Sequence, residues 1–470
     1  MALGTADVAH ILLALVVILV AAHGVGELFA RLRQPRVIGE IVGGLLLGPT
    51  VLGALAPAAQ HWLFPAHGTT ATVLGSTYQL GLLLLMYCSG IEVRSSVRRR
   101  EGRTVAWILG TGTVLPFLAG LAVLPFVAER TFYGPAGNHT SFLLVFGIAM
   151  AVTSIPVISR IMFDLGILGT PFSRIVIGAA VVEDVLLYIV LAVALGAAAE
   201  PSSALFGLPG AIGVVPGSSW DFAYHSAATV GVLGLSLLVG RPLYRATAAS
   251  RVNLVRRRSP VAFQLVFLLL ACLLCVFLGI QPFFGAFVAG IIVGSATTAP
   301  NPAEEGATVA IKDFAFAFFV PIYFAVVGLQ LDLLHSFNPL FFLAYLLFAC
   351  AVKAVSVYAG ARFGGQPASA AVNLAVAMNA RGGPGIVLAS VVFGAGIINQ
   401  SFYAVLVLLA IVTSLLAGSW LERVPRDRLL GAHDDGVPTR SRAGRATGRQ
   451  PHGIPAGEGG PVAHGDPAGG

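Results

Sequence analysis

Two adjacent carboxylates, Glu183 and Asp184, lie in the middle of an apolar run that extends over about residues 173–198. A run of this length can cross a lipid bilayer, so the pair is expected near the membrane midplane. An acid at that depth costs about 2.5–3.5 kcal/mol on insertion scales, which makes the pair a candidate functional site. Neighbouring residues on a helix point about 100° apart, so we expect one acid to meet a basic partner and the other to face a water-filled cavity.

A third ionisable residue, Lys353, lies inside a later apolar run. Lys312 and Lys353 are the only lysines among the 28 basic residues. A desolvated lysine can lose its proton and an arginine cannot, so Lys353 is suited to gain and lose a proton. The alternative is a lysine whose ammonium reaches the membrane interface. Two further acids, Glu27 and Glu40, lie near the ends of their runs, where acids more often anchor or pair than transport.

Two apolar runs carry helix breakers near their middles, each with polar residues beside the break. The breaks contain Thr153, Ser154 and Pro156 in the fifth run, and Asn379 and Arg381 followed by Gly382-Gly383-Pro384-Gly385 in the twelfth. An interrupted helix at membrane depth is tolerated where the freed backbone lines a cavity or is buried in protein. Two such runs in opposite directions predict an inverted-repeat transporter with its site between them. The alternative is a pair of ordinary Pro/Gly kinks.

The composition of the whole chain indicates a polytopic membrane protein. Of the 470 residues, 57% are hydrophobic and 10% are charged, which excludes a soluble globular domain. Thirteen apolar runs predict an all-α domain of about 13 transmembrane helices over residues 1–420. The runs lie at about 8–30, 37–55, 73–92, 104–128, 141–165, 173–198, 222–244, 260–279, 281–297, 314–333, 338–361, 369–394 and 400–420. Residues 421–470 are rich in Gly, Pro and Arg, and we expect a disordered cytoplasmic tail there.

The net charge of +7 comes from arginines that cluster after the first, third and seventh runs and in the tail. This pattern is typical of topology signals and not of a nucleic-acid surface. It predicts a multi-pass protein of the cytoplasmic membrane, with the amino terminus outside and the carboxyl terminus in the cytoplasm.

The sequence favours a secondary transporter over an enzyme. It contains no HExxH or GxSxG motif and no GxGxxG after a strand-like run. All four cysteines lie inside apolar runs, and the pair Cys272 and Cys275 has no polar neighbours, so neither a disulfide nor a metal site is indicated. We expect no cofactor, and no metal beyond a transported alkali cation.

Taken in order, several stretches resemble the second monovalent cation:proton antiporter family, which includes bacterial sodium/proton and potassium/proton exchangers. They are residues 34–49, 80–92, 153–160, the acidic pair, 279–290, 318–332 and 378–382. The resemblance implies an elevator-type antiporter of two inverted repeats with two broken, crossing helices, usually a homodimer. In such a protein a monovalent cation and protons compete for the acidic pair.

The resemblance also implies roles for individual residues. Asp184 matches the ion-binding aspartate of the family, and Glu183 matches the preceding position, which is typically Asp in electrogenic members. Lys353 matches the lysine that pairs with that preceding acid. Thr153 and Ser154 match the crossing of the broken helices, and Arg381 matches the basic residue of the second one.

The expected function is therefore exchange of Na⁺ or K⁺ for protons. Because protonation and cation binding exclude each other on one carboxylate, exchange needs no other chemistry. The alternative is a sodium-coupled organic-solute transporter on the same fold, which the Gly-rich second break would accommodate.

Overall fold

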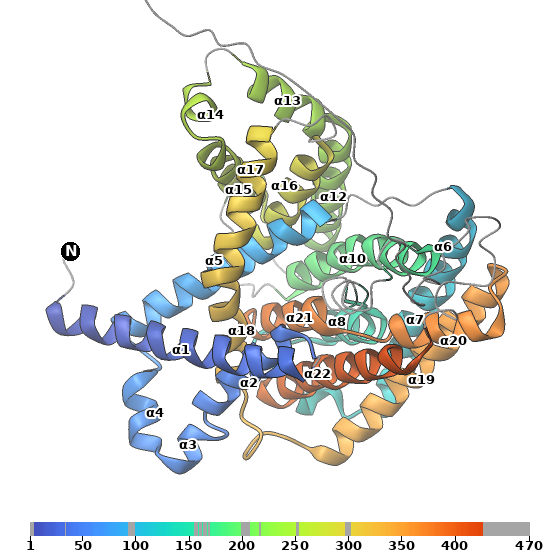
Figure 1. The fold of residues 1–470 in the computed structure, drawn as a ribbon, viewed down its shortest axis with the longest axis horizontal. Coiled ribbons are helices and arrows are strands. Elements are labelled where there is room, and N and C mark those ends of the chain that lie inside the picture. Colours follow the sequence, from blue (N-terminus) through green and yellow to red (C-terminus); the bar gives the residue numbers. More distant parts are fainter. Residues whose placement is uncertain are drawn as a thin grey trace, which may run out of the picture. The chain divides into compact units, whose positions relative to one another are not determined.

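The computed structural model describes residues 4–32, 34–92, 99–154, 158, 162, 167, 170–198, 207–215, 218–250, 253–296 and 302–425. Within these ranges the chain is helical, and its only β-type pairing is an isolated bridge between Tyr133 and Ile398 (Figure 1). Eleven of the described helical segments are long and apolar enough to cross a membrane. The two shorter apolar helices are α8 (His139–Ala151) and α16 (Pro282–Ala296).

The eleven segments and the two shorter helices correspond to the thirteen predicted apolar runs. In chain order the segments contain α1 (Thr5–Arg31), α2 (Arg36–Leu47) with α3 (Leu52–Leu55), α5 (Thr69–Glu92), α6 (Arg99–Gly112) with α7 (Val114–Val123), α10 (Pro171–Ala197), α12 (Ser219–Leu235) with α13 (Arg241–Ala249), α15 (Pro260–Phe277), α17 (Pro302–Phe314) with α18 (Val320–Leu329), α19 (Pro339–Phe363), α20 (Ala368–Ala377) with α21 (Gly382–Gly394), and α22 (Gln400–Arg423). The π-helical stretch η3 (Ser236–Gly240) joins α12 to α13, and the π-helical stretch η4 (Ala315–Phe319) joins α17 to α18. The short helices α4 (Pro57–Leu63), α11 (Leu208–Ala211) and α14 (Leu254–Arg258) lie in connections.

Local sequence explains where the helices of the later half begin. Asn338 accepts a hydrogen bond from the Phe341 amide and precedes a proline, so it caps α19. Asn399 caps α22 in the same way, by accepting from the Phe402 amide. A side chain of this kind satisfies one of the free amides in the first turn of a helix.

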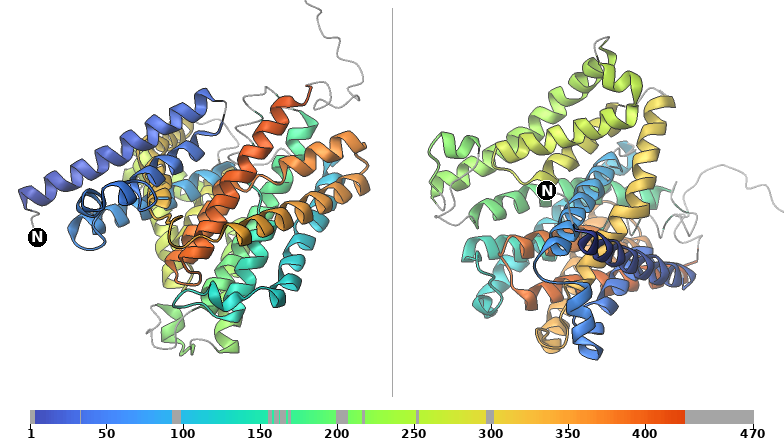
Figure 2. Two further views of the ribbon diagram at one scale, coloured as in Figure 1. Left: turned by 90° about the horizontal axis from the view of Figure 1, so that it is seen from below. Right: turned by 90° about the vertical axis from the view of Figure 1, so that its left-hand side faces the viewer.

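The helices pack as two groups with few contacts between them. The first group comprises α1, α2, α5, α13 and α15–α18, and the second comprises α6–α8, α10 and α19–α22. Helix α12 connects the two groups, because it packs against α10 and continues through η3 into α13. Figure 2 shows α19–α22, in orange and red, beside the teal helices α6–α8 of the same group.

Glycines allow close packing inside the first group. A Cβ atom at Gly44 on α2 would overlap the Ala325 carbonyl oxygen on α18, and one at Gly328 would overlap the Ile41 carbonyl oxygen. Membrane helices associate through such close backbone approach, because lipid provides no hydrophobic driving force between them. The Gly-rich motif at residues 34–49 therefore packs the first group and lies outside the acidic site.

Candidate functional site

Helix α10 carries both acids of the pair, and they have different surroundings. Lys353 Nζ on α19 donates hydrogen bonds to Glu183 Oε1 and Oε2 at 2.9 and 3.0 Å. The two side chains are 1% and 0% exposed, so the charges are paired in a fully buried place. Charges without a partner are costly there, and pairing with additional hydrogen bonds offsets that cost.

Thr113 is a further partner of Glu183 that sequence reasoning missed. Its hydroxyl donates to Glu183 Oε2 at 3.1 Å. The residue stands between α6 and α7, where this span is interrupted. A threonine in an apolar run usually bonds to its own helix, so only Pro116, three residues later, signals that the helix is disturbed here.

The two predicted breaks meet in the structure. The Thr153 hydroxyl donates to the Met378 carbonyl at 2.8 Å. The Ser154 amide donates to the Ala380 carbonyl at 2.6 Å, and the Gly383 amide donates to Ser154 Oγ at 3.1 Å. The backbone freed at each break is therefore bonded to the other break. Pro156 lies outside the described residues.

Side chains from α22 complete the start of α21. The Gly382 amide donates to Ser414 Oγ at 3.0 Å, and the Arg381 amide donates to Thr413 Oγ1 at 3.3 Å. These contacts satisfy amides that have no partner within the helix. No sequence signal pointed to Thr413 or Ser414, because each also bonds to a carbonyl of its own helix, as such residues commonly do.

The buried guanidinium of Arg381 lies against backbone carbonyls and not beside an acid. Its Nη2 donates to the carbonyl oxygens of Met150 and Ala349 at 3.3 and 3.0 Å, and its Nη1 to Asn379 Oδ1 at 3.1 Å. Among the described residues no carboxylate lies within ion-pair distance of it. Lys353 likewise donates to the Ala151 carbonyl. Both cations thus lie at the carboxyl-terminal end of α8, where the helix dipole favours positive charge.

Asn379 contacts the same region. Its Nδ2 donates to the Cys350 carbonyl at 3.3 Å, one helical turn before Lys353 on α19. The predicted residues at the second break are therefore connected to the helix that carries the lysine. Glu27 and Glu40 belong to the first group, where Glu27 pairs with Arg36 at 3.2 Å, and neither contributes to this site.

Asp184 has no ion pair and faces a small cavity. The residue is 2% exposed, and its Oδ1 has no hydrogen-bond partner among the described residues. The cavity measures about 10 Å³. Its walls come from α8, α10 and α21, and the lining residues are Ile148, Val152, Asp184, Leu187, Tyr188, Leu191, Pro384 and Leu388. A buried carboxylate oxygen without a partner needs a proton or a cation.

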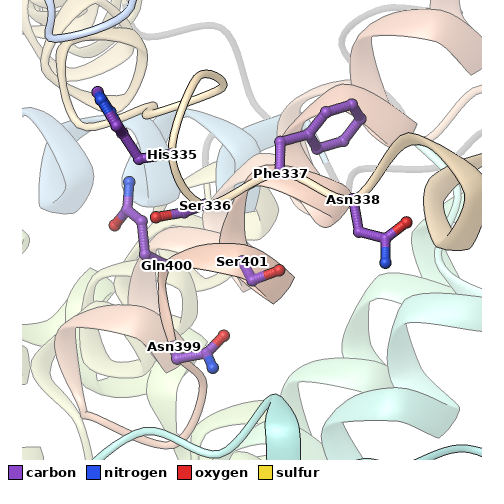
Figure 3. Close-up of a pocket in the computed structure, with 7 residues that line it drawn as sticks. All are labelled: His335, Ser336, Phe337, Asn338, Asn399, Gln400 and Ser401. Carbon is purple, nitrogen blue, oxygen red and sulfur yellow. The ribbon is translucent and has the colours of Figure 1, made fainter.

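A larger hollow, of about 430 Å³, lies elsewhere and shares no lining residue with this cavity (Figure 3). It is formed by the connection between α18 and α19 and by the start of α22. The lining residues are His335, Ser336, Phe337, Asn338, Asn399, Gln400 and Ser401. Since Asn338 and Asn399 cap helices, the polar lining is explained by the fold. Nor does the described part of the chain contain a group of three or more His, Cys, Asp and Glu residues placed to hold a metal ion.

Comparison with known proteins agrees with this architecture. Residues 11–426 match the family model described as sodium/hydrogen exchanger, transmembrane. The chain is 30% identical over 423 residues to the Na(+)/H(+) antiporter NhaS4 of Synechocystis, covering 88% of this chain and 97% of that protein. It is 32% identical over 410 residues to the cation/H(+) antiporter 20 of Arabidopsis thaliana, but it spans about half of that longer protein, 46%.

The fold is similar to that of a solved archaeal protein. The sodium proton antiporter MjNhaP1 of Methanocaldococcus jannaschii superposes with a TM-score of 0.62 at 15% identity, covering 88% of this chain and 97% of that one. The resemblance predicted from the sequence motifs is confirmed by the family match. The chain is a multi-pass membrane protein that belongs to the sodium/hydrogen exchanger family.

Proposed function

We propose that the protein exchanges a monovalent cation, Na⁺ or K⁺, for protons across the cytoplasmic membrane. The observation that carries the proposal is Asp184 Oδ1, a buried carboxylate oxygen without a partner beside a small cavity. The relatives named as Na(+)/H(+) and cation/H(+) antiporters support the same reaction.

The two acids divide the work. The Glu183 carboxylate is occupied by Lys353 and Thr113. Asp184 is therefore the acid that is free to bind cargo, and it holds either a cation or a proton at one time. Competition between these two states couples cation movement to proton movement in opposite directions.

The arrangement of the helices supports an elevator-type alternation. Glu183, Asp184, Lys353, Thr153 and Arg381 all belong to the second helix group, together with Thr113. The site can therefore move as a unit, since the bonds that shape it lie within that group. Sparse contacts with the first group lower the cost of a sliding motion.

The size of the cavity favours an ion over an organic solute. About 10 Å³ is the lower limit for one water molecule, which needs about 10–15 Å³ on the same measure. An organic substrate has no space beside Asp184 in this arrangement of the helices. The sodium-coupled organic-solute transporter is therefore the weaker of the two hypotheses.

The charge pattern of the connections supports an amino terminus outside and a carboxyl terminus in the cytoplasm. The family resemblance supports a homodimer. Both belong to the proposal. The disordered cytoplasmic tail predicted over residues 421–470 lies outside the described residues from residue 426 onward, and α22 extends to Arg423.

Proteoliposomes test the central claim. Purified protein is reconstituted with a pH-sensitive dye, and chlorides of Li⁺, Na⁺ and K⁺ are added outside. The wild-type protein should dissipate an imposed pH gradient with at least one of these ions, and Asp184→Asn should not. Asp332→Asn is the matched control, because this acid contacts His335 in the connection between α18 and α19. Gradient dissipation by Asp184→Asn at the wild-type rate would overturn the assignment.

A further inference from the structure

Tyr188 lies one helical turn after Asp184 on α10 and lines the same cavity. The other lining residues, apart from Asp184, are Ile, Val, Leu and Pro. Asp184 and Tyr188 are therefore the only lining residues whose side chains carry a polar atom. Side chains on a helix lean toward its amino terminus, which directs Tyr188 back over the turn that carries Asp184.

The Tyr188 hydroxyl has no partner in the part of the chain that the structure describes, although the residue is only 5% exposed. Two other buried tyrosines, Tyr87 and Tyr403, have partners, whereas the hydroxyls of Tyr244, Tyr323 and Tyr345 have none among the described residues. Tyr87 donates to Gln264 Oε1 at 3.1 Å, and Tyr403 donates to the Val327 carbonyl at 2.9 Å. Of the residues that line the cavity, Asp184 and Tyr188 thus each carry an oxygen that makes no hydrogen bond to a described residue, and the two residues are one helical turn apart.

The position of the Tyr188 ring is held by the first helix group. Its centroid lies 5.1 Å from that of Phe287 and 6.3 Å from that of Phe283, both edge to face, on α16. These contacts use the ring and leave the hydroxyl free. A phenylalanine at this position would keep the ring packing and remove only the oxygen.

Building on the proposed function, we propose that the Tyr188 hydroxyl is the second side-chain ligand of the transported cation, which is a small alkali ion that has lost most of its water. A hard cation is bound by oxygen atoms, and a hydroxyl oxygen has two lone pairs for it. In the proton-loaded state the same oxygen accepts a hydrogen bond from the protonated Asp184 carboxyl group. Tyr188 thus serves both cargoes without carrying charge.

The test compares Tyr188→Phe with the wild-type protein in transport and in binding. Transport should show an apparent KM for the alkali cation raised on the order of ten-fold, with kcat retained, because a hydroxyl contact to a charged group is lost. Binding is measured separately as the rise of the unfolding temperature on addition of LiCl, NaCl or KCl against choline chloride. Tyr188→Phe should lose most of that rise.

Tyr345→Phe is the matched control. Tyr345 is buried in the second group and its hydroxyl also has no partner, but it packs against Phe146, Phe341 and Phe402, away from the cavity. It should keep the wild-type KM and the wild-type cation-dependent stabilisation. Tyr188→Leu, which removes ring and hydroxyl together, should raise KM at least as much as Tyr188→Phe and provides the second variant if the first unfolds.

The outcomes separate this inference from the proposed function. Wild-type exchange with unchanged KM and unchanged stabilisation in Tyr188→Phe would overturn the ligand role alone. If the wild-type protein moves no protons but its cation-dependent stabilisation requires Asp184 and Tyr188, the exchange is refuted and the binding site is retained.

Discussion

At the scale of single residues, the site separates a paired acid from an open one. Glu183 accepts from Lys353 and Thr113, whereas Asp184 Oδ1 accepts from no described residue. Adjacent positions on a helix point in different directions, so consecutive acids are suited to this division. In the proposed exchange, Glu183 keeps Lys353 in place while Asp184 exchanges its cargo.

The buried pair makes a specific prediction about stability. Glu183→Gln should lower the free energy of unfolding by about 3–5 kcal/mol, because it leaves the Lys353 ammonium buried without a counter-charge. Lys353→Gln should have a similar effect on the carboxylate. The double replacement should be less damaging than the sum of the two, which thermal unfolding of the four proteins in detergent measures as a double-mutant cycle. Additive losses would show that the two side chains act independently.

Charged residues inside apolar runs could be predicted from the sequence, and neutral polar residues that meet their partners only through helix packing could not. Glu183, Asp184 and Lys353 were found because a charge inside an apolar run is costly wherever its partner lies. Thr113 and Tyr188 were missed, since a threonine or tyrosine in such a run is unremarkable until the cavity or the partner is seen. Their roles depend on packing between helices, which hydropathy does not describe.

At the scale of helices, the seam between the end of α18 and the start of α22 joins the two groups. Tyr403 on α22 donates to the Val327 carbonyl at 2.9 Å, and the Gln400 side chain donates to the Gln330 carbonyl. The breaks were predicted from Pro, Gly and polar residues, and the structure places them together. This seam, in contrast, has no signal in the sequence, because its acceptors are backbone carbonyls.

A cross-link across this seam should stop transport if the groups slide. Cysteines replace Gln330 and Gln400 in a background without the native thiols, and a short reagent with two thiol-reactive ends joins them. Transport should fall to the background level after cross-linking and stay normal when a reagent with one reactive end is used. Cysteines at Tyr133 and Ile398, which form a backbone bridge inside the second group, provide the control pair. Undiminished transport by the cross-linked Gln330 and Gln400 pair would rule out motion at this seam.

At the scale of the whole molecule, eleven of the thirteen predicted apolar runs correspond to described segments long enough to span a membrane, and the other two contain shorter helices. Helix α8 ends at Ala151 because residues 152–154 leave the helical conformation at the first break. Helix α16 begins at Pro282, three residues after Gly279, whose φ of 74° ends the preceding helix. A hydropathy count registers both as apolar runs and cannot tell that they are too short to span a membrane as one helix.

The orientation in the membrane has a direct test. A cysteine at Ala211, exposed in the connection after α10, should react with a membrane-impermeant thiol reagent added to intact cells. One at Ser250, exposed within the arginine-rich stretch 241–258, should react only after permeabilisation, because positively charged connections stay in the cytoplasm. Mass-tag gel shifts quantify both. The reverse pattern would invert the proposed topology.

The buried guanidinium of Arg381 has a consequence for the electrical behaviour of the transport cycle. Arginine keeps its proton in proteins, so the empty site holds two negative charges, from Glu183 and Asp184, and two positive charges, from Lys353 and Arg381, which sum to zero. Loading Asp184 with one alkali ion or one proton then gives the same single positive charge. The proposed exchange is therefore electroneutral unless Lys353 releases its proton when the cation binds. A measured reversal potential thus reports the protonation of one lysine.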